Sequence, residues 1–408
     1  MSKEKRRVPK LRFPGFTEDW EQRKLDNIAK IKTGGGTPKT TNLEYWSGDI
    51  PWIQSSDLVE GDVVHVNIKK FIDNNALKNS AAKLISRDSI ALVTRVGVGK
   101  VAVINQDFTT SQDFLSLSDF DGNDIKFIAY QLFRLMQENA KVLQGTSIKG
   151  ISKTDLIEQS IAIPNSIKEQ NLIASLLSQT DSIITLHQRK LNNLKLKKKA
   201  LLQKLFPKNG KRYPELRFPG FTDAWEQRKL SDILVERNEQ QVETNEYPLM
   251  SFVQGHGVIP KGERYDRSFL VLDQSKKYKR TELGDFIYSS NNLETGSIGI
   301  NKTGKAVISP VYSIFYGVSI GDSQFIGIMS LLPRFIAKMI RFRQGVVYGQ
   351  WRIHEKDFLD ISILIPSEAE RTKITKLILS IEELITLHQR KLDHLQLQKK
   401  ALLQQMFV

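Results

Sequence analysis

The sequence predicts an α/β (α+β) protein with two globular domains, each built on a twisted β-sheet, and two long helices that form an antiparallel coiled coil between them. Two observations support this fold class: an internal repeat, and a heptad pattern inside the repeated segments. Residues 184–191 read ITLHQRKL, and the same letters return at 385–392. A repeat of this length at a fixed offset predicts an internal pseudo-two-fold repeat.

The repeated segments have the apolar spacing of a coiled coil. Their seam positions follow one another in alternating steps of four and three residues, without proline or glycine. A 3.5-residue period held over about four heptads favours a coiled coil over an ordinary globular helix. The predicted seam consists of Ile173, Leu177, Thr180, Ile184, His187, Leu191, Leu194, Lys198, Leu201 and Leu205 in the first helix, and Ile374, Ile378, Ile381, Ile385, His388, Leu392, Leu395, Lys399, Leu402 and Met406 in the second.

Polar residues interrupt both predicted seams at equivalent places. His187 and His388 share one seam position, and Lys198 and Lys399 share another. Polar seam residues can fix the register of a coiled coil at a cost in stability. Metal binding or catalysis is the alternative for the histidines. The register role is favoured, because no other metal-ligand spacing accompanies either histidine.

A second repeat opens each half of the chain. Residues 11–25 read LRFPGFTEDWEQRKL, and residues 216–230 read LRFPGFTDAWEQRKL. The Pro-Gly pair in each copy predicts a turn. The aromatic residues beside it, Trp20 and Trp225 among them, are able to pack in a core or to stack on bases. Core packing is favoured, because both halves keep the same aromatic residues.

The segments between the repeats, roughly 26–163 and 231–365, differ in sequence but share a plan. In the first, residues 90–96 and 100–104 predict strands around a glycine-containing turn; in the second, 286–290 and 305–320 take the corresponding part. Each segment then predicts a helix, near 124–143 and near 323–343. Each closes on a matching phrase that ends at Pro164 or Pro366, after which a long helix should begin.

Composition limits the functional classes. The formal net charge of +15 favours an acidic partner such as nucleic acid. The absence of cysteine excludes disulfides and cysteine-based metal sites or nucleophiles. The basic N-terminus is not followed by an apolar stretch, and the sequence has no run of 18 apolar residues, so we expect a soluble cytoplasmic protein.

Motifs for catalysis are missing from the sequence. Residues 97–100 read GVGK, but without the upstream glycine spacing and the Ser or Thr of a phosphate loop they predict a tight turn between strands. No kinase, zinc-protease or hydrolase motif is present. The sequence therefore favours binding. Two divergent domains on a duplicated frame, together with the positive charge, suggest a reader of a two-part DNA site.

Three stretches give the chain a family resemblance. LRFPGFTEDWEQRKL, GGGTPKTTNLEYWSGDIPWIQSSDL (34–58), and LHQRKL with KKALLQKLF resemble the specificity subunit of type I restriction-modification enzymes. The resemblance covers essentially the whole chain and includes the duplication. It implies a non-catalytic subunit whose two target-recognition domains each read one half of a bipartite, asymmetric DNA site. Only the first domain carries the GGTP phrase, so the two should read unrelated half-sites.

The resemblance also implies a division into segments and a set of partners. The helices should set the spacer and dock two methyltransferase subunits, and restriction subunits should join through that complex. No cofactor is expected on this chain, since S-adenosylmethionine and ATP/Mg belong to the partner subunits. The implied segments are 1–25 (N-terminal repeat), 26–163 (first recognition domain), 164–207 (central helix), 208–230 (linker and second repeat), 231–365 (second recognition domain) and 366–408 (C-terminal helix).

Candidate DNA contacts follow from side-chain chemistry alone. Arg, Lys, Asn and Gln read base edges, while Ser and Thr often hold phosphates, and polar loops beside strands are the expected places. A solvated loop is the alternative for each of them. The candidates are Lys39, Thr40, Ser55, Ser56, Arg95, Lys100, Ser111, Gln112, Thr146, Ser147 and Lys149 in the first domain, and Ser289, Ser290, Asn291, Asn292, Lys302, Lys305, Tyr348, Gln350 and Arg352 in the second.

Two rival functions remain open from the sequence. One is an enzyme, a self-contained DNA methyltransferase or nuclease, which the missing motifs oppose. The other is a coiled-coil scaffold without sequence specificity, which the two diversified domains oppose. The basic run that includes Arg189, Lys190 and Lys195 is equally compatible with a solvated helix face and with contact to a DNA spacer or an acidic partner.

Overall fold

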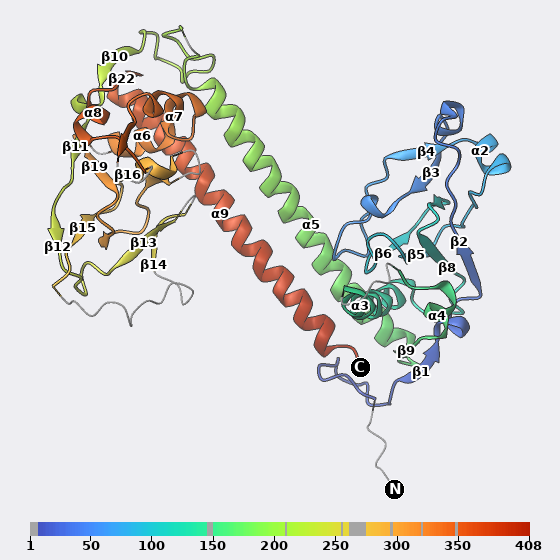
Figure 1. Ribbon diagram of the computed structural model, residues 1–408. Helices are drawn as coiled ribbons and strands as arrows, with labels where there is room; N and C mark the ends of the chain where they lie inside the picture. The colour runs from blue at the N-terminus through green and yellow to red at the C-terminus, as the bar shows by residue number, and fades with distance from the viewer. Residues whose placement is uncertain are drawn as a thin grey trace. The chain divides into compact units, whose positions relative to one another are not determined.

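The structure of the protein is a computed structural model that describes residues 7–144, 150–208, 210–253, 256–260, 275–293, 297–319, 321–346 and 350–408. The chain divides into two compact units. Unit 1 consists of Met1–Lys190 with His388–Val408, and unit 2 consists of Leu191–Leu387. The division cuts both long helices, so each unit contains part of each (Figure 1).

Unit 1 is built on a four-stranded antiparallel sheet in the order β2-β8-β5-β6. A smaller sheet, β4-β3-β7, and a two-stranded pair, β1-β9, complete its strands. The strands are β1 (Glu21–Lys24), β2 (Ile31–Gly34), β3 (Ile50–Ile53), β4 (Lys70–Ile72), β5 (Ser89–Val93), β6 (Val101–Ile104), β7 (Thr109–Thr110), β8 (Phe114–Ser118) and β9 (Ser160–Ile163). The helices are α1 (Leu25–Ile28), η1 (Leu43–Trp46), η2 (Ser55–Asp57), α2 (Asn74–Asn79), α3 (Ile125–Gln144) and α4 (Lys153–Glu158).

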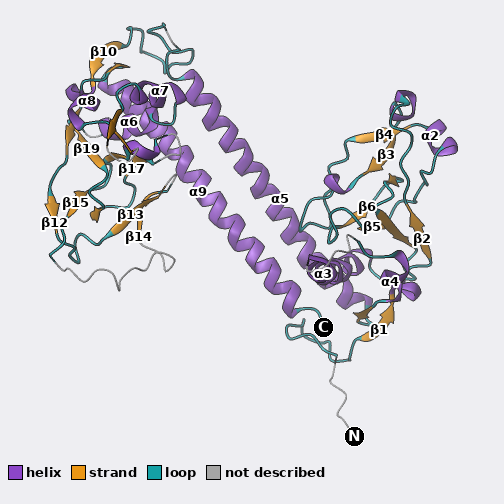
Figure 2. Ribbon diagram, viewed as in Figure 1, coloured by secondary structure: helices purple, strands orange, loops and turns teal. Residues whose placement is uncertain are grey.

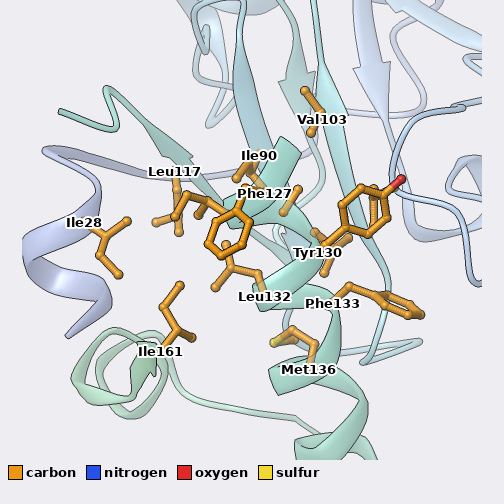
Figure 3. Packing of buried hydrophobic residues seen from close by; sticks show 14 of the residues in the cluster. Ile28, Ile90, Val103, Leu117, Phe127, Tyr130, Leu132, Phe133, Met136 and Ile161 are labelled. Carbon is orange, nitrogen blue, oxygen red and sulfur yellow. The ribbon is translucent and has the colours of Figure 1, made fainter. Parts of the chain in front are cut away.

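Both faces of the four-stranded sheet of unit 1 are buried. Ile90 of β5 lies beside Phe127 of α3 (Figure 3), and Leu92 of the same strand belongs to the same buried cluster. The alternate residues of β5, Ala91 and Val93, belong to a second cluster on the opposite face, with Ile53 of the smaller sheet. This two-sided burial explains why the strand reads as a continuous apolar run. Trp20 is buried against Phe127 and Phe407, which confirms that it packs in a core.

Unit 2 repeats the main sheet in the order β11-β19-β16-β17. It adds a three-stranded sheet, β12-β15-β18, and the pairs β13-β14, β20-β21 and β10-β22 (Figure 2). The strands are β10 (Glu226–Lys229), β11 (Leu234–Glu236), β12 (Gln240–Gln241), β13 (Met250–Val253), β14 (Gly257–Pro260), β15 (Tyr278–Thr281), β16 (Phe286–Tyr288), β17 (Ile298–Ile300), β18 (Ala306–Ile308), β19 (Ser313–Gly317), β20 (Gln344–Val346), β21 (Gln350–Arg352) and β22 (Ser362–Ile365). The helices are η3 (Leu230–Asp232), η6 (Ser290–Asn292), α6 (Asp322–Met329), α7 (Pro333–Ile340) and α8 (Glu355–Leu359).

The predicted helix near 323–343 is wrong as a single element. The structure has α6 and α7, separated by residues 330–332. Pro333 takes the first position of α7, where its missing N–H costs nothing, whereas it would interrupt the interior of a longer helix. The predicted strand run 305–320 is likewise two strands in different sheets, with a turn in which Tyr312 N–H donates to the Ser309 carbonyl.

The two long helices are α5 (Ile167–Lys204) and α9 (Glu368–Gln405), drawn in green and red in Figure 1. Each begins shortly after the proline that the sequence marks. In unit 1, Asp181 contacts Lys399 and His187 contacts His388, so the two chain directions are opposed. This confirms the predicted antiparallel pairing. No helix among the described residues is both long and apolar enough to cross a membrane.

Candidate nucleic-acid interface

A glycine-rich loop leaves the main sheet of unit 1 at the end of β2. The Gly36 N–H donates to the Thr110 carbonyl at 2.9 Å, and the Trp52 indole N–H donates to the Gly36 carbonyl at 3.1 Å. A Cβ atom at Gly35 would lie 2.0 Å from the Ser111 carbonyl oxygen. The loop therefore lies against the end of β7 so closely that Gly35 has no room for a side chain.

Further loops of unit 1 meet this one at the same end of the sheet. The Thr37 hydroxyl donates to the Gln112 side-chain oxygen at 2.5 Å, and the Ser111 N–H donates to the Ile53 carbonyl at 3.0 Å. The Thr94 N–H donates to the Asp113 carbonyl at 2.8 Å. The segments 34–37, 53–57, 94–100 and 110–113 thus form one surface. It includes the candidates Ser55, Ser56, Arg95 and Gln112, whereas the candidate Ser111 is buried.

The turn between β5 and β6 forms part of that surface. Gly97 and Gly99 have φ values of 88° and 111°, as a tight turn requires, so the predicted turn is confirmed. The Lys100 ammonium donates to the carbonyls of Ser55 and Leu58 at 3.0 and 3.2 Å. Lys100 therefore joins two loops to each other, whereas Arg95 is exposed.

Two basic residues that sequence reasoning missed lie beside the glycine loop. These residues are Lys83 and Lys153. A Cβ atom built on Gly34 would lie only 2.1 Å from Lys153 Nζ, so the ammonium lies next to this glycine. Burial lowers the pKa of the Lys153 ammonium, and the neighbouring cations Lys83 and Arg95 lower that pKa further. Lys153 stands at the position of Glu355 in the matching closing phrases, and this charge reversal was the signal available in the sequence.

In unit 2 the corresponding loops also meet. The Ser290 hydroxyl oxygen accepts the Ile353 N–H at 3.0 Å, and the Asn291 side-chain oxygen accepts the Trp351 N–H at 2.6 Å. Candidate residues of η6 therefore lie against β21, which contains Arg352. Trp351 is half exposed at this place. An exposed indole beside amides and a guanidinium has the chemistry of a base-contacting surface.

The charges of unit 2 are paired at this surface. The Glu355 carboxylate accepts the Ser313 hydroxyl at 2.8 Å and lies 3.8 Å from Lys279 Nζ and 3.7 Å from Arg352 Nη2. Burial raises the pKa of Glu236, and its neighbour Glu355 raises that pKa further. Lys279 and Arg352 are therefore both within ion-pair distance of the Glu355 carboxylate.

Other candidates lie away from these two surfaces or outside the described residues. Thr40, which follows Lys39 in the sequence, lines a separate hollow of about 430 Å³ in unit 1, together with Trp46 and Lys70. Lys302 is ion-paired with Glu382 of α9, and Lys305 with Glu246. Thr146, Ser147, Lys149 and Tyr348 lie outside the described residues, as do the side chains of Asn292 and Gln350. Ser289 is buried.

The predicted seam residues lie on the helix faces that are covered. The buried members are Ile173, Leu177, Leu191, Leu205, Ile374, Ile378, Ile381, Leu392, Leu395 and Met406, and the half-buried ones are Ile184, His187, Leu194, Leu201, Ile385, His388 and Leu402. The seam lysines each have an acidic partner on the other helix: Lys399 pairs with Asp181, and Lys198 with Glu382 at 2.7 Å. No cluster of three or more potential metal ligands occurs in the described parts of the chain.

The comparisons with known proteins agree with this picture. Residues 17–196 match the family model described as "Type I restriction modification DNA specificity domain". Over 188 residues the chain is 33% identical to the specificity subunit of the type I restriction enzyme MjaIX of Methanocaldococcus jannaschii, covering 45% of this chain and 42% of that protein. Over 157 residues it is 30% identical to the EcoR124I/EcoR124II specificity subunit of Escherichia coli, covering 37% of this chain and 38% of that protein. Both matches therefore span less than half of each relative.

The fold comparison extends over the whole chain. The structure of the type I restriction-modification S subunit from M. genitalium superimposes with a TM-score of 0.67 at 16% sequence identity, covering 98% of this chain and 99% of that one. At this identity the likeness establishes the fold. Residues 17–196 are therefore similar to type I restriction-modification DNA specificity domains, and the chain as a whole has the fold of a type I specificity subunit.

Proposed function

We propose that this chain is the DNA-specificity subunit of a type I restriction-modification complex and that each unit reads one half of a bipartite DNA site. The observation that carries the proposal is one sheet topology with two different sets of loops. The family match covers the loops of unit 1, and unit 2 presents its own loops at the same end of an equivalent sheet. A duplicated frame with diversified contact loops suits two unrelated half-sites.

The chemistry of each surface supports a DNA contact. Unit 1 presents Gln112 and Arg95, which are able to read base edges, next to serine and threonine hydroxyls that suit phosphates. Unit 2 presents Asn291 and Arg352 together with the half-exposed Trp351, whose backbone N–H contacts Asn291. Because the side chains differ, the two half-sites should differ as well, which makes the site asymmetric.

The same proposal includes two copies of a methyltransferase subunit, docked on the long helices. At three equivalent positions of the repeat both units expose a large apolar side chain there: Ile183, Leu186 and Leu397 in unit 1, and Leu384, Leu387 and Leu196 in unit 2. The exposed fractions are 43%, 62% and 66% in both sets. Equivalent apolar positions, exposed to the same extent, suit a partner that binds once per unit. In this proposal the helices also set the spacer between the half-sites.

Chemistry is assigned to the partners in this proposal. The methyltransferase subunits would bind S-adenosylmethionine, and restriction subunits, which join through the complex, would bind ATP and Mg²⁺. This chain would contribute recognition and assembly without catalysis. The rival in which the chain is itself a methyltransferase predicts methyl transfer to DNA when the purified chain is incubated with labelled S-adenosylmethionine.

The proposal is tested by sequencing the methylome of a host that expresses this chain with its methyltransferase. A host with the methyltransferase alone is the control. We expect a new split motif that depends on this chain, and a native mass of the complex that corresponds to two methyltransferase copies. Absence of a new motif, with both proteins soluble and associated, would favour the scaffold without sequence specificity.

Loop variants make that test specific to each unit. Gln112→Ala in unit 1 and Asn291→Ala in unit 2 change exposed loop side chains of equivalent surfaces. Each should relax the sequence requirement in one half of the motif and leave the other half unchanged. Discrimination of about 1–3 kcal/mol per well-placed contact predicts a clear change in site preference. Changes in both halves from one substitution would contradict the assignment of one half-site to each unit.

A further inference from the structure

Three basic side chains of unit 1 converge on the glycine loop from separate parts of the sequence. Lys153 Nζ lies against the backbone of Gly34. Ala81, two residues before Lys83, packs closely against the loop, because a Cβ atom on Gly36 would lie 2.1 Å from the Ala81 carbonyl oxygen. Arg95 lies beside Gly150, whose Cβ position would be 3.2 Å from Arg95 Cγ, and the Ile151 N–H donates to the Thr94 carbonyl. The fold itself therefore assembles the cluster.

The charge of this cluster is not compensated by the rest of unit 1. None of the three side chains forms an ion pair with any acid among the described residues. By contrast, Lys30, which precedes the glycine loop in the sequence, is paired with Asp121 at 2.9 Å. The three cations lie close enough for Lys83 and Arg95 to lower the pKa of Lys153, so their mutual repulsion opposes folding. An anion bound among them would remove that repulsion.

We propose that the loop 34–37, with Lys83, Arg95 and Lys153, is a binding site for a phosphate of the DNA backbone, and that the described residues of unit 2 form no such site at the equivalent place. This inference rests on the proposed function. Lysine ammonium groups and a guanidinium suit phosphate oxygens. The glycines let the loop pack closely on residues 81 and 110–111, which brings the separate parts of the cluster together. Contacts of this kind fix the position of the duplex and add affinity that is independent of base sequence.

Among its described residues, unit 2 lacks the cluster at the equivalent place. Lys153 corresponds to Glu355, which is itself close to Lys279 and Arg352. At the end of β11, where unit 1 has its glycine loop, Arg237 is paired with Asp285 at 2.8 Å. The basic groups there are neutralised by the protein. The two half-sites should therefore contribute unequally to the salt dependence of DNA binding.

The test measures how the affinity of the complete complex for DNA depends on salt. Lys83→Gln and Lys153→Gln each remove one charge from the cluster, and Lys30→Gln removes one paired charge from the same unit as a matched control. For each lost phosphate contact the slope of log K against log salt should fall by about 0.9. The control should keep the wild-type slope. Lys153→Arg keeps the charge and should retain most of the affinity that Lys153→Gln loses. This result would show that the loss in Lys153→Gln comes from the missing charge and not from misfolding.

The outcomes separate this site from the proposed function, because the slope is also measured on DNA without the recognition site. The site is supported if the cluster variants lose affinity by the same factor on specific and unrelated duplexes. An unchanged slope would overturn the site while leaving sequence reading intact. A loss confined to the specific duplex would also overturn it, because the side chains would then read bases. A wild-type complex without sequence preference would refute the proposed function alone.

A second arm separates DNA phosphate from a small free anion. Inorganic phosphate replaces chloride at constant ionic strength while DNA binding is measured. We expect the same small loss of affinity in the wild type and in Lys153→Gln, since ionic strength is unchanged. Saturable release of DNA at millimolar phosphate, absent in Lys153→Gln, would assign the cluster to a small anion and overturn the proposal.

Discussion

Units 1 and 2 are alike where the frame is held together and unlike where their loops face outward. In unit 1, Arg12 makes a two-point ion pair with Glu169, at 2.7 and 2.9 Å. In unit 2, Arg217 makes the same pair with Glu370, both distances being 2.8 Å. Both glutamates are 1% exposed. Buried, directional pairs fix how the N-terminal repeat packs on its helix, and this part of the frame cannot vary without leaving a charge unpaired.

The outward loops have no such constraint, and there the units differ in both charge and side-chain type. Unit 1 gathers cations without an ion pair among the described residues around glycines, whereas at the equivalent place in unit 2 Lys279, Arg352 and Arg237 each lie within ion-pair distance of a carboxylate. The comparison indicates that the repeated frame preserves geometry and that the loops carry specificity. It also implies that equivalent substitutions in the two frames should lower the free energy of unfolding by different amounts only where the buried hydrogen-bond partners differ.

The largest expected effect comes from breaking the buried arginine pairs. Arg12→Ala and Arg217→Ala each leave a buried glutamate unpaired, which typically costs about 3–5 kcal/mol. Trp20 Nε1 also donates to Glu169 at 3.3 Å, whereas the buried Trp225 Nε1 has no hydrogen-bond partner among the described residues. Glu370 would therefore keep less support than Glu169, and Arg217→Ala should lower the free energy of unfolding more.

Hydrogen exchange of backbone amides, followed separately in the two units, measures both losses. Each substitution should destabilise its own unit and leave the other within about 0.5 kcal/mol, the limit within which distant sites are additive. Equal losses, or a larger loss for Arg12→Ala, would show that the Trp20 hydrogen bond does not stabilise Glu169.

The seam lysines give the next largest expected difference. Lys399 is 6% exposed and bonds to Asp181, which also accepts the Tyr130 hydroxyl at 2.7 Å. Lys198, 22% exposed, pairs with Glu382. Lys399→Met should therefore cost about 3 kcal/mol, the lower end for a broken buried pair, and Lys198→Met about 1 kcal/mol or less. Burial raises the pKa of Asp181, so its carboxyl can take up a proton when Lys399 is absent, which limits the loss.

Urea unfolding of the variants at two pH values measures this difference. Because protonation of Asp181 removes the buried unpaired charge, the loss caused by Lys399→Met, relative to the wild type at the same pH, should shrink as pH falls. The double variant Lys399→Met/Asp181→Leu should recover most of the stability, since both charges are gone. A double variant as unstable as Lys399→Met would indicate that packing, not charge, causes the loss.

The parts of the fold that the sequence predicted are those set by local pattern. The heptads, the turn at Gly97 and the buried Trp20 depend on spacing and residue type within a short window. The convergence of Lys83 with Lys153 depends on how sheets and loops meet, and residues 70 positions apart carry no common local signal. Lys100 shows the reverse failure: its residue type suggested DNA, but nearby carbonyls hold its ammonium.

The smallest expected effect concerns pH and the histidine pair of unit 1. The Nδ1 atoms of His187 and His388 lie 2.9 Å apart, so one of them must lack its proton for a hydrogen bond to form. Burial, Lys190 and His187 lower the pKa of His388 below its usual 6.5. Between that lowered pKa and 6.5 the unfolded chain binds more protons than the folded one, so the stability of unit 1 should decrease as pH falls below about 6.5.

His388→Gln should reduce this decrease in stability, whereas His394→Gln, at an exposed position of the same helix, should leave it unchanged. Unfolding of unit 1 followed between pH 7 and pH 5 is the measurement, and a pH dependence that His388→Gln leaves intact would assign the effect to other groups.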